Sequence, residues 1–238
     1  MRLHHKLNSS ARTLINMTLL SVAMFWANSC AYATERITVA VASSLYTAIQ
    51  QQAQRFEKEH DVSIHLIPGS TGRLYNQIMQ GAPFDLLIAA DDERPALLQK
   101  AGKATTSIAV GKGYVGIAIG CRVVRDVSQL KAAAIRHIAI ANPDVAPFGQ
   151  VSKHYLQQQG LWKILTAKFV YAQNALQATM MVNKGLVDAA FIPVTAHDYH
   201  IATITYRAVL LTNKPYAHAF LQALPALGGG ASAPQESL

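Results

Sequence analysis

The segment Ile64–Asp91, IHLIPGSTGRLYNQIMQGAPFDLLIAAD, contains an apolar run, a loop of small residues, a helical pattern and a second apolar run. The loop, Gly69–Gly72 (GSTG), lies where a strand is expected to lead into a helix. Backbone N–H groups gather around bound anions at such junctions. Because the loop contains no lysine, we expect an anion here to be bound by hydroxyl and backbone N–H groups.

The alternation of strand and helix patterns continues along the chain. Strands are expected at residues 36–42, 62–67, 84–91, 114–120, 136–142, 168–172 and 188–194, and helices at 45–59, 73–80, 150–159 and 176–184. Nearly continuous apolar strands that alternate with amphipathic helices are typical of parallel sheets with helices on both faces. The expected fold class is therefore α/β.

Small or helix-capping residues follow four of these strands. They are Ser43-Ser44, the Gly69–Gly72 loop, residues 143–149 and Gln173-Asn174. Ligands of open α/β sheets bind at the carboxyl ends of the strands, so we expect the four junctions to converge on one ligand. Serine, threonine and asparagine are also ordinary helix N-caps, and each junction taken alone is open to that structural interpretation.

The composition and the missing motifs exclude several classes of function. The chain has 238 residues, 51% of them hydrophobic and 14% charged, which is typical of a globular protein. Its basic residues are scattered singly, so no nucleic-acid partner is expected. No phosphate-binding P-loop, no glycine-rich dinucleotide motif after a strand and no nucleophile elbow is present, and we expect neither a cofactor nor a catalytic residue.

Two polar pairs have structural interpretations. His197 and His200 lack the further ligands of a metal site, so no direct metal ligand is expected. Asp91-Asp92 is expected to cap the helix at 93–100 instead of acting as a pair of catalytic carboxylates.

The amino terminus has the pattern of a secretory signal peptide. Residues 1–33 contain three basic residues and no acidic one, and an apolar stretch at 14–27 is followed by Ala31-Tyr32-Ala33. The stretch is shorter than the ~20 residues of a membrane span, so we expect cleavage after Ala33 and a periplasmic protein. A lipoprotein modified at Cys30 is the alternative. The mature chain would carry a net charge of about +5, with Cys121 as its single cysteine.

Four segments of the chain, 37–64, 69–98, 138–160 and 174–191, resemble the periplasmic molybdate-binding proteins of ABC transporters. The most specific pieces are GAPFDLLIAAD and NPDVAPFG. The resemblance implies a type II periplasmic-binding-protein fold with two lobes, each a mostly parallel sheet flanked by helices. The lobes would close over tetrahedral molybdate or tungstate.

The resemblance also implies five ligand-binding residues. Ser44 and Thr71 match positions whose hydroxyl groups bind the oxyanion, and Ser70 lies beside Thr71. Phe148 and Ala175 match positions that donate backbone N–H groups. The metal of the oxyanion would have no direct protein ligand.

The chain departs from the family pattern at two places. Pro193 stands where some members have a tyrosine, which leaves the identity of the anion open. Residues 225–238, PALGGGASAPQESL, replace the final helix, and we expect them to form a flexible tail. We expect residues 34–111 and 195–224 to form lobe 1 and residues 112–194 to form lobe 2.

The expected function is capture of the oxyanion and its delivery to the membrane permease of an ABC transporter, by a monomer without enzymatic activity. One alternative is the same fold with another anion: a phosphonate, sulfate or a small organic anion. A second alternative is an exported enzyme or an adhesion-type module.

Overall fold

The computed structural model describes residues 34–224, so the predicted signal peptide (1–33, with Cys30) and the predicted tail (225–238) lie outside the described residues. The strands are β1 (Glu35–Ala42), β2 (Val62–Gly69), β3 (Leu86–Ala89), β4 (Ser107–Ile119), β5 (Arg122–Val124), β6 (Ile138–Ala141), β7 (Phe169–Ala172), β8 (Ala189–Val194) and β9 (Ala202–Leu210). The α-helices are α2 (Tyr46–Glu59), α3 (Thr71–Met79), α4 (Glu93–Lys100), α5 (Pro147–Gln158), α6 (Trp162–Leu165), α7 (Ala175–Asn183) and α8 (Pro215–Ala223). Short 3₁₀ turns are η1 (Ser43–Leu45), η2 (Val127–Lys131) and η3 (Thr166–Lys168).

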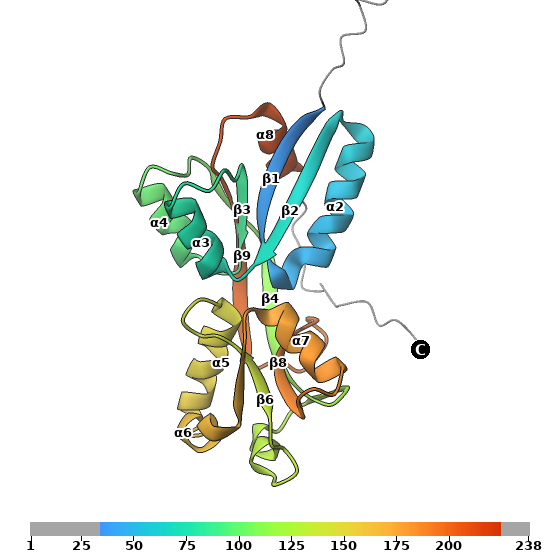
Figure 1. The fold of residues 1–238 in the computed structure, drawn as a ribbon, viewed down its shortest axis with the longest axis vertical. Coiled ribbons are helices and arrows are strands. Elements are labelled where there is room, and N and C mark those ends of the chain that lie inside the picture. The colour runs from blue at the N-terminus through green and yellow to red at the C-terminus, as the bar shows by residue number, and fades with distance from the viewer. Residues whose placement is uncertain (1–33, 225–238) are drawn as a thin grey trace, which may run out of the picture. The chain divides into compact units, whose positions relative to one another are not determined.

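The strands of the described residues form one hydrogen-bonded sheet, in the order β2-β1-β3-β9-β4-β8-β6-β7, with β5 paired to β4. β1 is parallel to β2 and β3, and β6 is parallel to β7 and β8. Figure 1 shows α2, α3 and α4 with the β2-β1-β3 end of the sheet, and α5 and α7 with the β6 end. The long strands β4 and β9 connect the two ends. This is the predicted two-lobe α/β fold.

The centre of the sheet differs from the parallel arrangement expected from the apolar runs. β9 is antiparallel to both β3 and β4, and β4 is antiparallel to β8. The apolar pattern within a strand does not depend on the direction in which the strand runs. The sequence pattern therefore predicted β4 and β8 without their direction.

Apolar residues at helical and strand spacing build the core. Ile49, Ala53 and Phe56 lie on one buried face of α2, and they join the core cluster that contains the inner residues of β1. Residues Val39–Val41 are fully buried, as expected for a strand with both faces covered. On the other face, Leu74 and Ile78 of α3 pack in a second cluster with β3.

Helix starts agree with the sequence analysis, with small shifts. α3 begins at Thr71, two residues before the expected start, so the GSTG loop contributes to the first turn of the helix. The Oδ1 atom of Asp91, the residue before the N-cap position of α4, accepts a hydrogen bond from the backbone N–H of Arg94 at 2.9 Å, so Asp91 supplies a capping side chain for the helix. Asp92 instead accepts from the Nε atom of Arg207, at 2.6 Å.

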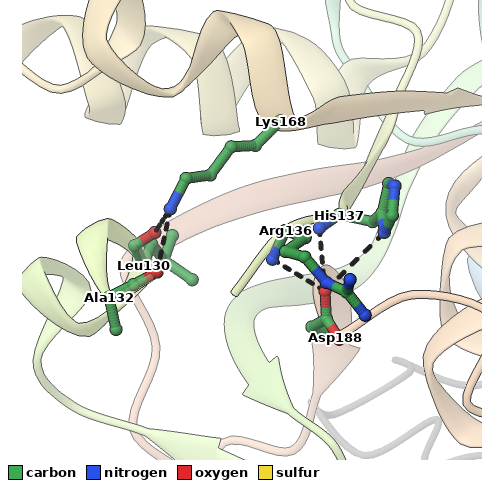
Figure 2. Close-up of polar contacts among 6 residues, drawn as sticks. All are labelled: Leu130, Ala132, Arg136, His137, Lys168 and Asp188. Atoms are coloured by element: carbon green, nitrogen blue, oxygen red, sulfur yellow. Dashed lines mark hydrogen bonds and ion pairs between the residues drawn. The ribbon is translucent and has the colours of Figure 1, made fainter. Parts of the chain in front are cut away.

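Polar contacts fix the loops at the β6 end of the sheet (Figure 2). The Nζ atom of Lys168 donates to the carbonyl oxygens of Leu130 and Ala132, both at 3.0 Å. The Oδ2 atom of Asp188 accepts from the backbone N–H groups of Arg136 and His137, both at 2.8 Å. Hydrogen bonds from these two N–H groups lower the pKa of Asp188. Lys168 thus connects η3 to the end of η2, and Asp188 connects the segment before β8 to the segment before β6. The side chains of Lys168 and Asp188 therefore have structural roles.

Across residues 34–224, no helix is both long enough and apolar enough to cross a bilayer.

Candidate functional site

A small pocket lies where four strand-to-helix junctions meet. Its lining residues are Ala42, Ser43, Ser44, Gly69, Ser70, Thr71, Ala90, Ala146, Phe148, Asn174 and Ala175. The four junctions therefore meet at one pocket, and their binding of one ligand stays a prediction. All five residues proposed from the sequence, Ser44, Ser70, Thr71, Phe148 and Ala175, line this one pocket.

The first turns of three helices supply donors to the pocket. Thr71 is the first residue of α3, Phe148 the second of α5 and Ala175 the first of α7. The first four N–H groups of a helix have no partner within it, and the helix dipole places partial positive charge there. The three helix starts therefore present N–H groups and positive potential to one small volume.

The hydroxyl of Ser70 lacks a partner. The residue is 4% exposed, and its Oγ atom is the one buried side-chain polar atom in the described part of the chain without a hydrogen bond. An unsatisfied buried polar group costs about 1–3 kcal/mol of stability. A protein keeps such a group where a ligand satisfies it, and Ser70 lies on the pocket wall.

Thr71 is held in a fixed orientation. It is 1% exposed, and its Oγ1 atom accepts a hydrogen bond from the backbone N–H of Ala90 at 3.0 Å. One lone pair of this hydroxyl is therefore used by the residue that follows β3. Its hydrogen remains available as a donor.

Ser44 has a partner that the sequence analysis missed. The hydroxyl of Tyr206, on β9, donates to the Oγ atom of Ser44 at 3.1 Å. Tyr206 is buried, and this burial raises its pKa to about 12, although the hydrogen bond to Ser44 opposes the shift. The phenol therefore keeps its proton at neutral pH. No local signal in the sequence relates Tyr206 to Ser44, because they meet only through the pairing of β9 in the sheet.

Asn174 caps α7 at the edge of the pocket. Its side-chain oxygen accepts from the backbone N–H of Gln177 at 2.9 Å. This is the N-cap arrangement that competes with a binding role for the Gln173-Asn174 junction. The two interpretations are compatible in the structure, since Asn174 both caps the helix and lines the pocket.

The pocket combines hydroxyl groups with small apolar residues, and none of the described residues on its wall carries a formal charge. The guanidinium of Arg73 lines an adjoining cavity of about 160 Å³ and donates to the Oε1 atom of Gln173 at 3.2 Å. Pro193 lies in β8, paired with Val115, and is not part of the pocket wall. Between Thr34 and Leu224, no group of three or more His, Cys, Asp or Glu side chains is arranged to hold a metal ion.

Hydroxyl groups and helix N-termini around an uncharged cavity suit a small anion that offers only acceptors. Comparison with known proteins agrees with this chemistry. The family model described as bacterial extracellular solute-binding protein matches residues 37–220. The chain belongs to this family.

Three relatives of this solute-binding protein are informative. The molybdate-binding protein ModA of Azotobacter vinelandii is 32% identical over 171 residues, covering 70% of this chain and 68% of the relative. ModA of Escherichia coli strain K12 is 31% identical over 184 residues, covering 73% and 72%. The solved structure of the Azotobacter vinelandii periplasmic molybdate-binding protein has a TM-score of 0.70 at 25% identity, covering 79% of this chain and 90% of that one. These relatives are solute-binding proteins and not enzymes, and they confirm the family that the sequence motifs predicted.

Proposed function

We propose that this protein is an exported carrier that captures molybdate or tungstate in the pocket and delivers it to an ABC-transporter permease, without catalysing a reaction. The observation that carries the proposal is the donor set of the pocket. The hydroxyl of Ser70 has no protein partner, and it lies among other hydroxyls and three helix N-termini on a wall without formal charge. The identity of the relatives as molybdate-binding proteins supports the choice of anion.

The proposed ligand contacts are shared between five residues. Ser44, Ser70 and Thr71 donate through their hydroxyls, and Phe148 and Ala175 through their backbone N–H groups. About five charge-assisted hydrogen bonds at roughly 1.5–3 kcal/mol each contribute about 7.5–15 kcal/mol, a range that includes the ~8–12 kcal/mol of micromolar-to-nanomolar binding. A formal positive charge in the pocket is therefore not required.

We further propose the lobe boundaries of 34–111 with 195–224, and 112–194. The hydroxyl donors then lie in lobe 1 and the two N–H donors in lobe 2, so that binding favours closure. The pocket has a cavity volume of about 10 Å³, which is close to what one water molecule requires. A tetrahedral oxyanion is larger than water, so the lobes must separate to admit it.

Thermal unfolding with molybdate, tungstate, sulfate and phosphate tests the proposal. A ligand at a thousand times its dissociation constant adds about 4 kcal/mol, which raises the Tm of a chain of this size by roughly 8–16 °C. We expect such shifts with molybdate and tungstate. Sulfate should shift the Tm less because it is smaller, and phosphate less because its proton finds no acceptor among the donors.

Two variants complete the test. Ser44→Ala should weaken molybdate binding in titration calorimetry, whereas Ser63→Ala, which changes an exposed serine of β2, should not. A Tm that none of the four anions changes would contradict the proposal. Turnover of a substrate that Ser44→Ala abolishes would instead identify an enzyme.

A further inference from the structure

The fold provides a slot for the phenol of Tyr206. Strands β4 and β9 pair antiparallel, and Gly113 of β4 lies against the phenol of Tyr206. A Cβ atom at Gly113 would collide with the hydroxyl oxygen and the Cζ atom of Tyr206. The missing side chain of Gly113 therefore makes room for the phenol beside Ser44. Because Tyr206 is not on the pocket wall, any effect it has on a ligand passes through Ser44.

The direction of the hydrogen bond determines what Ser44 offers to a ligand. A serine hydroxyl has one hydrogen to donate and two lone pairs that accept. Tyr206 donates to the Oγ atom of Ser44, so one lone pair is used and the hydrogen of Ser44 does not point to Tyr206. That hydrogen is available on the side of the pocket.

We propose that Tyr206 is a positioning residue that orients the hydroxyl of Ser44 as a donor and thereby discriminates against protonated oxyanions. The inference rests on the proposed function of the pocket. A fully deprotonated oxyanion accepts from Ser44 without penalty. An anion that keeps a proton needs an acceptor for that proton. An oriented Ser44 directs its own hydrogen toward the anion, so two donors would face each other.

The state of Tyr206 supports this role. Its pKa is raised to about 12 by burial, so it remains a neutral donor over the pH range in which a bacterium lives. The other two hydroxyls differ from Ser44 in their partners. Thr71 accepts from a backbone N–H group, which no side-chain substitution removes, and Ser70 has no partner that fixes its hydrogen.

Tyr206→Phe keeps the buried ring and removes the donor. The Kd values for molybdate, sulfate and phosphate should be measured by titration calorimetry at a mildly alkaline pH, where phosphate still carries one proton. We expect about a fivefold loss of affinity for molybdate and for sulfate, in line with one lost hydrogen bond. Phosphate affinity should change little, because the freed Ser44 can accept its proton. The preference for molybdate over phosphate then falls about fivefold, while the preference over sulfate is unchanged.

Two further variants separate orientation from folding. Tyr216→Phe, which removes the hydroxyl of a half-buried tyrosine on α8, should leave all three Kd values unchanged. Ser44→Ala should itself lower the preference for molybdate over phosphate, and Tyr206→Phe should change nothing further in that background. If Tyr206 had a purely structural role, Tyr206→Phe would weaken the binding of all three anions equally, with or without Ser44→Ala.

The outcomes are distinguishable from failure of the proposed function. If the unchanged protein binds none of the anions, the proposed function is wrong. If it binds molybdate and Tyr206→Phe leaves the ratio of molybdate to phosphate affinity unchanged, only the role of Tyr206 is overturned.

Discussion

The hydroxyls of Ser44, Ser70 and Thr71 lie in one pocket but have three different hydrogen-bond states. Ser44 accepts from a phenol, Thr71 accepts from a backbone N–H group, and Ser70 has no partner. Each state leaves the hydroxyl hydrogen free to donate. The residues are therefore alike in what they offer an anion, although they differ in what they contribute to the stability of the protein without it.

Ser70→Ala should separate stability from binding. Removing a buried hydroxyl without a partner should raise the free energy of unfolding of the ligand-free protein by about 1 kcal/mol. The same change should weaken molybdate binding by about tenfold or more, because a charge-assisted hydrogen bond is lost. Urea unfolding and titration calorimetry measure the two effects.

Ser152→Ala is the matched control. Ser152 is fully buried on α5, and its hydroxyl donates to the carbonyl oxygen of Phe148 at 2.7 Å. Removing a hydroxyl that has a partner should not stabilise the protein. If Ser70→Ala lowers the free energy of unfolding as well as the affinity, the hydroxyl of Ser70 has a structural role and the interpretation is wrong.

At the scale of elements, the site is made from helix starts at the ends of strands. β1, β2, β6 and β7 each lead into a junction that lines the pocket. Periodicity predicted these strands and helices, and small residues predicted the junctions, because both signals are local. The antiparallel direction of β4 and β9 was not predicted, since the pairing of distant strands leaves no mark on the pattern within either one.

Asn174→Asp tests the helix start of α7. Aspartate caps a helix as well as asparagine does, and its charge suits the helix dipole, so the free energy of unfolding should stay within about 0.5 kcal/mol. The carboxylate would lie on the pocket wall, where it repels an anion. We expect at least a hundredfold loss of molybdate affinity in titration calorimetry.

Asn174→Ala gives the opposite combination. It removes the cap and should cost about 1 kcal/mol of stability, with a much smaller loss of affinity because no charge is added. Equal affinities of the aspartate and alanine variants would show that the anion does not bind next to α7.

At the scale of the whole described molecule, α3 contacts the connection between β6 and α5 next to the pocket. The backbone N–H of Gly72 donates to the carbonyl oxygen of Val145 at 2.9 Å. A Cβ atom at Gly72 would lie 2.7 Å from that oxygen, which is closer than real Cβ atoms approach. This contact therefore requires glycine for reasons of space, and it joins the β2-β1-β3 end of the sheet to the β6 end.

Gly72→Ala should hold these two parts of the molecule apart. Alanine favours a helix interior, so α3 itself should remain intact. If the closed form is less populated, the apparent affinity for the ligand falls by the same factor as that population. We expect a larger radius of gyration in small-angle X-ray scattering and at least a tenfold weaker Kd for molybdate.

Ser63→Ala is the control for Gly72→Ala. It changes an exposed serine of β2 that is not on the pocket wall, so the radius of gyration and the Kd for molybdate should stay close to those of the unchanged protein. An unchanged radius of gyration in Gly72→Ala would contradict the proposed role of this contact.

The residues that line the pocket were predictable from the sequence, but the residues that contact them from behind were not. The five residues that the resemblance implied line the pocket, and each lies at or near a strand end that the local pattern predicted. Tyr206 was not predicted, since it lies 162 positions from Ser44 in the sequence and reaches it only through the register of β9. The lack of a partner for Ser70 depends on packing, and no local pattern records it.

The position of β9 has a consequence for how the chain is made. β9 enters the sheet between β3 and β4, so that Leu86 pairs with Leu210 near the end of the described residues. A nascent chain therefore carries two unpaired strand edges until residues 202–210 emerge. Pairing over such long distances is slow, and open edges recruit other chains. A chain that stops before β9 is therefore expected to aggregate and not to fold into a stable partial protein.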